Sequence, residues 1–237
     1  MSPPLTSTSN RKQKSVLFLG DCNTLGTPDI EGKAYPEQFA NELRALAINC
    51  GHTMTTVREG SEYLASRFTK NTDAVCLQYG LVDSWKTFKF SPYILYYPDS
   101  RRRKFARKLV KKFKKWCKSL GLNALIGEDN VVPVSEYRNR ILSFIEHCAP
   151  KPLVLIETVP NKDISRNAEI RRYNAALKEL AAQHEHVWLL PIYDDFCETM
   201  SEHYSDPTHL SETGHAHVAK KLSNLFNETI FTDQKQL

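Results

Sequence analysis

The sequence predicts an α/β protein in which helices cover both faces of a parallel sheet. Short segments that are apolar throughout alternate with longer segments whose apolar residues recur at helical spacing. Strands without polar alternation are typical of parallel sheets that are buried on both faces. Reactive residues follow several of these strands, where open α/β sheets place their sites. The chain has 237 residues, of which 41% are hydrophobic and 25% charged, which excludes a disordered protein and allows one large domain.

The expected strands are short and together give a central sheet of about five strands. They are residues 16–19, 73–79, 153–158 and 187–190, with the β-prone residues 53–57 as a fifth candidate.

The expected helices show apolar residues every three or four positions. Tyr35, Phe39, Leu43, Leu46 and Cys50 predict a helix over 35–50. Further helices are expected at 135–148 with Ser135 as N-cap, at 165–184 and at 211–226, and Ser61 is a candidate cap for a short one.

The domain organisation follows from this alternation. Residues 1–14 are rich in Ser, Thr, Pro and Lys and are expected to be a disordered lead. Residues 15–230 are expected to form a single domain that carries a basic helical insertion at about 84–134.

Several protein classes are excluded by what the sequence lacks. A membrane-spanning helix needs about 20 apolar residues, and the longest apolar strings here are only a few residues. The N-terminus has no apolar run of the kind a secretion signal needs, so a cytoplasmic location is expected, with peripheral membrane association as an alternative. The six cysteines show no CxxC spacing, and the histidines at 184, 186, 215 and 217 suggest no ligand set. No metal, disulfide framework or cofactor is predicted.

A nucleophile, a base and an acid stand at the predicted strand ends. Cys22 lies between the glycines of Gly20-Asp21-Cys22-Asn23-Thr24-Leu25-Gly26, directly after the first strand. His209 and Asp206 precede the last helix, three residues apart. Such a set can act as thiol, general base and orienting carboxylate. Asp194 and Asp195 are competing candidates for the acid, ranked below Asp206.

These blocks resemble the SGNH (GDSL-like) hydrolases and acyltransferases over roughly residues 15 to 226. The family's Gly-Asp-Ser block reads Gly20-Asp21-Cys22, its Gly-x-Asn-Asp block reads Gly80-Leu81-Val82-Asp83, and its Asp-x-x-His block reads Asp206-Pro207-Thr208-His209. The resemblance implies a flavodoxin-like three-layer α/β/α fold and acyl transfer from an ester. It also implies an oxyanion hole formed by the backbone N–H groups of Cys22 and Gly60, with Asp21, Gly80 and Asp83 supporting the site.

Two departures from the family pattern change the expected chemistry. Cys22 replaces the nucleophilic serine, so the acyl intermediate would be a thioester. Val82 replaces an asparagine that donates to the oxyanion, and the loss of one such donor typically costs about 10²–10³ in rate. Asn23 is a candidate replacement donor.

The basic residues are concentrated in one segment. Residues 101–118 hold eleven Lys and Arg and no acid, whereas the rest of the chain has 21 basic and 27 acidic residues. Phe105, Leu109, Phe113, Trp116 and Leu120 recur at helical spacing within it. The favoured interpretation is a helix whose apolar face packs on the domain with its cations in water. Alternatives are adsorption to an anionic membrane, or binding of an acidic carrier or polymer, while nucleic acid is not favoured. The candidate contacts are Arg101, Arg102, Arg103, Lys104, Lys108, Lys111, Lys112 and Lys115.

Two functions remain open. The first is an SGNH-type esterase or O-acyltransferase that acts on a small-molecule or carbohydrate ester, such as an acylated surface polysaccharide. The second is a binding module that keeps the fold, has lost the chemistry, and docks its basic helix on an anionic membrane, polymer or protein.

Overall fold

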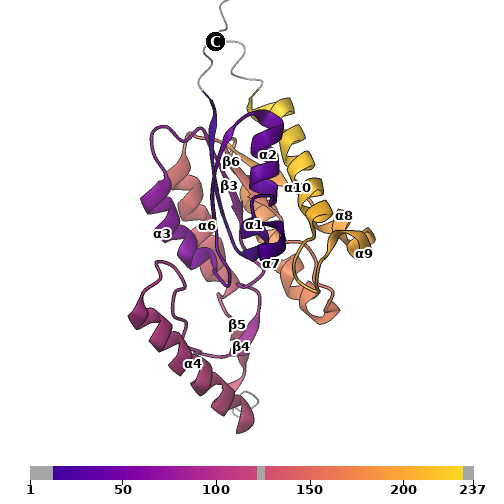
Figure 1. Ribbon diagram of the computed structural model, residues 1–237. Coiled ribbons are helices and arrows are strands. Elements are labelled where there is room, and N and C mark those ends of the chain that lie inside the picture. The colour runs from indigo at the N-terminus through magenta and orange to yellow at the C-terminus, as the bar shows by residue number, and fades with distance from the viewer. Residues whose placement is uncertain (1–12, 122–125, 232–237) are drawn as a thin grey trace, which may run out of the picture.

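The computed structural model describes residues 13–121 and 126–231, so most of the expected lead over 1–14 lies outside the described residues. Five parallel strands form the central sheet in the order β2-β1-β3-β6-β7. Their bounds are β1 Ser15–Gly20, β2 Leu46–Gly51, β3 Ala74–Gln78, β6 Leu153–Ile156 and β7 Val187–Leu190. The predicted α/β architecture with a five-stranded parallel sheet is confirmed (Figure 1).

Helices bury both faces of the sheet. Leu17 and Leu19 of β1 pack in the core that contains side chains of α3 (Val57–Arg67), α6 (Val134–Cys148) and α7 (Asn167–Ala181). Phe18 points to the opposite face and packs in the core formed with α2 (Tyr35–Leu43) and α10 (Glu212–Leu225). Because the side chains of a strand alternate between its faces, a strand covered on both faces has no polar positions.

The second strand lies where the sequence predicted a helix. Tyr35, Phe39 and Leu43 do belong to a helix, but α2 ends at Leu43, and Arg44 follows it in a left-handed conformation with φ of 52°. Leu46 through Gly51 then pair in parallel with β1. The helical spacing of Leu46 and Cys50 is therefore coincidental, and the expected strand at 53–57 is wrong.

Helix α3 begins earlier than the candidate cap Ser61 suggested. Thr56 is its N-cap and forms a capping box with Glu59, whose carboxylate accepts from the Thr56 N–H and hydroxyl. The expected cap of α6 also differs, because α6 begins at Val134 after Pro133 and includes Ser135.

The remaining elements are short. They are α1 (Cys22–Leu25), η1 (Pro28–Ile30), η2 (Ile164–Arg166), α8 (Tyr193–Glu198), α9 (Met200–His203) and η3 (Phe226–Ile230). Within the described ranges, no helix is long and apolar enough to cross a membrane.

The segment between β3 and α6 projects from the body of the domain. Strands β4 (Lys86–Phe88) and β5 (Glu128–Asn130) form an antiparallel pair, and the 19-residue helix α4 (Arg101–Ser119) lies beside them at the lower end of the molecule in Figure 1. Arg107 anchors α4 by donating to the Leu95 carbonyl at 2.8 Å and to Asp99 at 2.7 Å.

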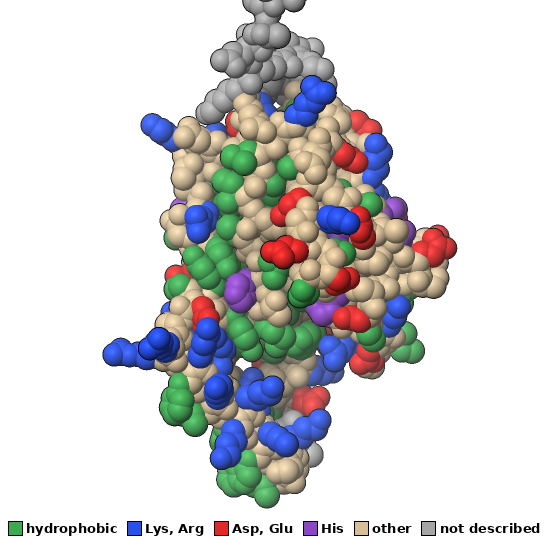
Figure 2. All heavy atoms as spheres, in the orientation of Figure 1, with side chains coloured by type: hydrophobic (Ala, Val, Ile, Leu, Met, Phe, Trp, Pro, Cys, Tyr) green, Lys and Arg blue, Asp and Glu red, His purple; other side chains and the backbone are tan. Residues whose placement is uncertain are grey.

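The apolar stripe of α4 does not pack on the domain, which contradicts the favoured interpretation of this helix. Phe105 is 64% exposed, Leu109 54% and Trp116 57%, while Phe113 touches Phe88 of β4 edge-on. Figure 2 shows Lys and Arg side chains gathered over this lobe, with hydrophobic side chains at its edge and tip.

Gly60 provides a test of the packing between α3 and the sheet. A Cβ at this position would lie 2.8 Å from the Tyr79 ring and 3.1 Å from Phe144. We expect Gly60→Ala to destabilise the protein by about 1–3 kcal/mol, because overpacking outweighs the better helix propensity of alanine. The melting temperature should fall by roughly 2–4 °C per kcal/mol in a domain of this size.

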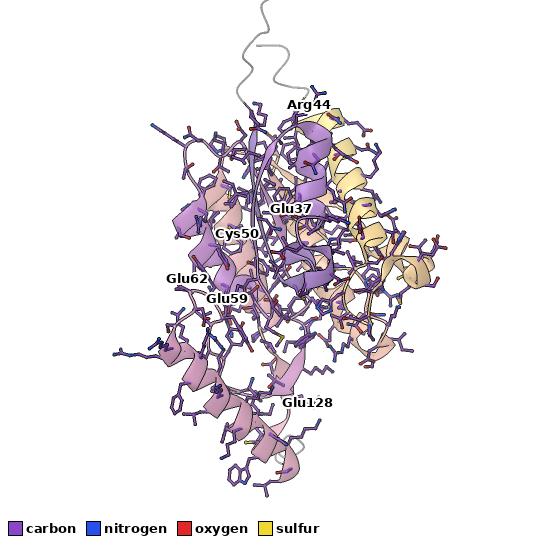
Figure 3. All side chains as sticks on the ribbon, viewed as in Figure 1. Glu37, Arg44, Cys50, Glu59, Glu62 and Glu128 are labelled. Carbon is purple, nitrogen blue, oxygen red and sulfur yellow. The ribbon has the colours of Figure 1, made fainter. Side chains whose placement is uncertain are left out.

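The matched control is Glu62→Ala, two positions further along α3 and exposed to solvent, as Figure 3 shows. Its melting temperature should stay near that of the unmodified protein. A Gly60→Ala variant that melts at a higher temperature than the parent would show that Tyr79 and Phe144 do not resist the added methyl group.

Candidate active site

The carboxyl ends of β1, β2 and β3 lie at the same edge of the sheet. The Gly20-Asp21-Cys22 motif begins at the end of β1 and therefore lies at this edge. Gly20, the last residue of β1, is paired with Gly51 of β2 and Gln78 of β3. A Cβ at Gly20 would lie 1.9 Å from the Thr24 hydroxyl oxygen and 2.8 Å from the Gln78 carbonyl oxygen. Only glycine lets the chain turn this closely, and the turn starts α1 at Cys22.

Cys22 lies at the first position of α1 in a small apolar cluster with Leu81, Ile170 and Tyr193. The residue is 8% exposed. Burial, and next to it the charge of Asp21, raise the pKa of the Cys22 thiol far above its ordinary value. The thiol is therefore protonated at neutral pH and needs a base to become a nucleophile.

His209 and Asp206 form the pair that the sequence predicted. The Nδ1 atom of His209 lies 2.6 Å from Oδ2 of Asp206, and Oδ1 of the same carboxylate accepts from the backbone N–H groups of Thr208 and His209. Burial acts to raise the pKa of Asp206, but these hydrogen bonds outweigh it and the net shift is downward. An ionised Asp206 holds the proton on Nδ1 and leaves Nε2 as the basic nitrogen.

Asn23 attaches the C-terminal motif to the turn that carries Cys22. Its Nδ2 donates to the Thr208 carbonyl at 3.3 Å, and its Oδ1 accepts from the Leu210 N–H at 3.2 Å. Because the two bonds lie on either side of His209, they hold this residue close to Asn23, which directly follows Cys22 in the chain. No hydrogen bond joins the Cys22 thiol to His209 among the described residues, and the backbone N–H groups of Cys22 and Asn23 lie close enough to the thiol to lower its pKa slightly against the effect of burial.

Asp195, a competing candidate for the triad acid, is bonded to other residues. Asp195 accepts from Nε2 of His217 at 3.1 Å and from the ammonium of Lys221. Asp206, and not Asp195, is therefore the partner of His209. In the described part of the chain, no group of three or more metal-ligating side chains is placed to hold an ion.

Two buried carboxylates support the turns around the site. Asp83 accepts from the backbone N–H of Val57 at 2.9 Å and of Gly80 at 3.0 Å, which ties α3 to the turn after β3. Asp21 caps α1 by accepting from the Asn23 N–H at 2.9 Å. Burial raises the pKa of Asp21 to about 7 and that of Asp83 to about 8.

The structure contradicts the expectation that Gly60 donates to an oxyanion. Gly60 lies inside α3, and its N–H points to the Thr56 carbonyl at 3.4 Å. The carboxamide of Asn23 is likewise engaged with the C-terminal segment. The backbone N–H groups of Cys22 and Met54 have no backbone acceptor among the described residues, and the Cys22 N–H lies close to its own thiol.

Met54 was missed by the sequence analysis. It lies in the loop after β2 and has a φ of 64°, which non-glycine residues rarely adopt. No sequence signal marked it, because the residue type at this position is unrelated to its backbone conformation.

The basic helix contributes to a cavity beside the site. Of the eight cations expected to contact an anion, Lys104, Lys108 and Lys111 line this cavity, together with Met54 and Val82 from the rim of the sheet. Arg101, Arg102, Arg103, Lys112 and Lys115 are not among its lining residues. Arg107 and Lys114 line the cavity too. They lie three residues from Lys104 and Lys111 and so share one face of the helix, a spacing from which the sequence could have identified them.

Comparisons with known proteins support the fold. No family model and no curated protein matches the chain. Solved structures do match, among them a catalytic mutant of the acetylxylan esterase Axe2 from Geobacillus stearothermophilus, with 18% identity, 89% of this chain and 93% of that chain covered, and a TM-score of 0.57. A putative lipolytic protein of the G-D-S-L family from Desulfitobacterium hafniense has 13% identity, coverage of 90% and 99%, and a TM-score of 0.62. A putative platelet activating factor protein from Streptococcus pneumonia has 18% identity, coverage of 92% and 86%, and a TM-score of 0.59. The chain therefore shares the α/β/α fold of these proteins.

The raised pKa of Asp21 predicts a pH dependence of stability. Between about pH 4 and pH 7 the unfolded chain releases a proton that the folded protein retains, so the free energy of unfolding falls as the pH rises. Asn cannot ionise and keeps an acceptor for the Asn23 N–H. We expect Asp21→Asn to gain stability relative to the unmodified protein as the pH is raised from 5 to 8, as measured by thermal melting of both proteins in parallel.

Carboxylates with lowered pKa values, such as Glu136 beside Arg58 and Arg140, make the free energy of unfolding rise with pH instead. They do so equally in the parent and in Asp21→Asn, so their effect cancels when the two melting temperatures are subtracted. A difference in melting temperature that stays constant between pH 5 and pH 8 would contradict the raised pKa of Asp21.

Proposed function

We propose that this protein is an acyl-transfer enzyme that uses Cys22 as nucleophile, His209 as general base and Asp206 to orient the imidazole. The observation that carries the proposal is the arrangement of His209. Oδ2 of Asp206 lies 2.6 Å from Nδ1 of His209 and orients the ring. Asn23 bonds to the backbone on both sides of His209 and so holds this segment against the turn that carries Cys22. Two distant parts of the chain, the turn with Cys22 and Asn23 and the segment 206–210, are therefore joined at the carboxyl edge of the sheet.

The reaction follows from these positions. Nε2 of His209 takes the thiol proton as the sulfur attacks the ester carbonyl, and a carbon–sulfur bond forms while the carbonyl oxygen becomes an oxyanion. The oxyanion collapses, the bond to the alkoxy group breaks, and the imidazolium returns its proton to the leaving alcohol. The thioester on Cys22 is then cleaved by water or by an acceptor hydroxyl, which His209 deprotonates in turn.

The environment of Cys22 favours general-base catalysis over a resting thiolate. Burial and Asp21 disfavour the thiolate, so deprotonation has to accompany attack on a bound ester. The proposal requires the sulfur and the imidazole to come into hydrogen-bonding contact, and active-site hydrogen bonds often tighten when the substrate binds.

The oxyanion donors in this proposal are the backbone N–H groups of Cys22 and Met54, neither of which has a backbone acceptor among the described residues. Both residues follow the carboxyl ends of adjacent strands, β1 and β2, at the paired residues Gly20 and Gly51. Val82 supplies no donor, so we expect a rate about 10²–10³ lower than that of an enzyme with a third donor.

The substrate proposed is an O-acyl ester on a carbohydrate, such as an acylated surface polysaccharide. The fold is shared with an esterase described as acting on acetylxylan and with a G-D-S-L lipolytic protein, and this likeness supports an ester as the reacting group.

The test is a comparison of three variants on 4-nitrophenyl acetate, followed by intact-mass measurement of the acetylated protein. Cys22→Ala and His209→Ala should each lose about 10²-fold or more in rate, because one lacks the nucleophile and the other lacks the base. The control Cys197→Ala removes the exposed thiol, and it should keep the parental rate.

The acetyl adduct should appear on Cys22 in the parent and in Cys197→Ala, and it should be absent from His209→Ala. Equal rates in all four proteins would refute the catalytic proposal and leave a protein with the fold but without the chemistry.

A second candidate function is docking on an anionic bilayer, and the exposed stripe of α4 favours it. Phe105, Leu109 and Trp116 are each more than half exposed on a helix that also carries eleven cations and no acid. An apolar stripe flanked by Lys and Arg is the pattern of helices that lie in the membrane interface. The negative surface of a phosphatidylglycerol bilayer complements this charge, whereas the rest of the chain has more acids than bases and would be repelled.

Co-sedimentation with vesicles tests this candidate. The protein should bind phosphatidylglycerol vesicles at low salt and not phosphatidylcholine vesicles, and the triple variant Phe105→Ser/Leu109→Ser/Trp116→Ser should bind about tenfold more weakly. The control Ile164→Ser removes an apolar side chain that is 81% exposed on η2, and it should bind like the parent. No binding to either vesicle at low salt would exclude the bilayer as the partner of α4.

A further inference from the structure

A cavity of about 620 Å³ lies between the projecting segment and the rim of the sheet. Its volume falls in the range of about 300–1,000 Å³ that is typical of small-molecule sites. Val82 and Met54 contribute from the sheet rim, and α4 contributes one of its faces. None of its lining residues belongs to the Cys22–His209–Asp206 set, but Met54, whose N–H is a proposed oxyanion donor, lines it, so the cavity adjoins the proposed site.

Part of the cavity wall is apolar. Trp85, Ile94, Val110 and Val131 line it, together with Val82, and they come from four separate segments of the chain. A surface of this kind is suited to a hydrocarbon chain, because burying the chain there removes apolar area from water on both sides.

The side formed by α4 is cationic. Lys108, Lys111 and Lys114 all line the cavity, and none of them forms an ion pair within the described residues. The neighbouring cations Lys104 and Arg107 are already paired with Asp99. No Asp or Glu lines the cavity. Three lysines without an ion-pair partner among the described residues therefore line a cavity whose wall contains no carboxylate.

Lys114 is the least exposed of these three lysines. It is half-buried, and burial lowers the pKa of its ammonium group. A half-buried charge without a partner costs free energy in the unoccupied protein, and an anion in the cavity would remove this cost.

Buried anchors hold the walls in place. Glu59 of α3 is fully buried and accepts from the Tyr93 hydroxyl at 2.9 Å and from the Tyr96 N–H at 2.7 Å. Figure 3 shows Glu59 at the end of α3 that faces the projecting segment. Arg107 stacks on Tyr96 at 4.7 Å and so connects α4 to the same loop. The cavity is therefore formed before any ligand binds, which lowers the entropic cost of binding.

From these observations we infer that the cavity binds an anionic amphiphile, namely a hydrocarbon chain that ends in a phosphate group. The chain lies against Trp85, Ile94 and Val131, and the phosphate contacts Lys108, Lys111 and Lys114. Three ammonium groups match a phosphate better than a carboxylate, because a phosphate monoester carries more than one negative charge near neutral pH.

The position of the cavity connects this ligand to the candidate active site. Val82 lines the cavity, while the preceding residue, Leu81, packs against Cys22. An amphiphile bound here would therefore lie next to the nucleophile and could carry the acyl group or its acceptor. This connection rests on the proposed function, whereas the binding itself does not.

Calorimetry with dodecyl phosphate below its micelle concentration tests the binding. Lys108→Gln/Lys111→Gln/Lys114→Gln should weaken binding about tenfold or more, because it removes the charge-assisted contacts. The matched control, Arg102→Gln/Lys112→Gln/Lys115→Gln, removes three cations from the same helix that do not line the cavity. It should bind within about twofold of the parent.

Two further ligands separate the contributions of head and chain. Inorganic phosphate lacks the chain and neutral dodecyl glucoside lacks the charge, so each should bind about tenfold or more weakly than dodecyl phosphate. Ile94→Glu, which places a carboxylate in the apolar wall, should also weaken dodecyl phosphate binding, with circular dichroism used to confirm that the variant is folded.

Three outcomes would overturn the inference: no binding of dodecyl phosphate, equal weakening in both triple variants, or equal affinity for dodecyl glucoside. Cys22→Ala should bind dodecyl phosphate as tightly as the parent. A protein that binds the amphiphile but shows no acyl transfer would keep this inference and refute the catalytic proposal.

Discussion

The candidate site depends on the two hydrogen bonds between Asn23 and the C-terminal segment. Asn23 and Leu210 are 187 residues apart in sequence. The two bonds act together with the burial of Leu210 in the core beside α2, and with the bond from the Tyr35 N–H to His215, to hold the segment at this edge of the sheet. The bonds use both ends of one carboxamide, one as donor and one as acceptor, so they fix the direction of the segment as well as its distance. The sequence made Asn23 a candidate oxyanion donor, whereas in the structure its carboxamide contacts the C-terminal segment.

Buried carboxylates organise the rest of this edge of the sheet. Asp83 connects the start of α3 to the turn after β3, and Glu59 connects α3 to the projecting segment. Each accepts several hydrogen bonds from backbone or hydroxyl donors, which is what allows a carboxylate to be buried. Helix α3 therefore links the turns of the candidate site on one side to the cavity on the other.

The sequence predicted those features that depend on local pattern and failed where tertiary contacts decide. The apolar runs at β1 and β3 identified buried strands, since strands covered on both faces leave no room for polar side chains. Strand β2 lies at the edge of the sheet and is only partly buried, so its apolar residues could be assigned equally to a helix. The periodicity of α4 identified its apolar face correctly. Periodicity cannot say whether protein covers that face, and the interpretation that it packs on the domain was wrong.

The turn from Gly80 to Asp83 explains how one substitution alters two parts of the molecule. Leu81 packs against Cys22, Val82 lines the cavity, and Asp83 is buried with its carboxylate holding the turn. In the family that the sequence resembles, the second of these positions carries a side chain that donates to the oxyanion. Valine removes that donor and replaces it with an apolar surface facing the cavity. If the proposed function and the proposed ligand are both correct, valine at this position removes a donor from the reaction centre and adds apolar wall for the ligand beside it.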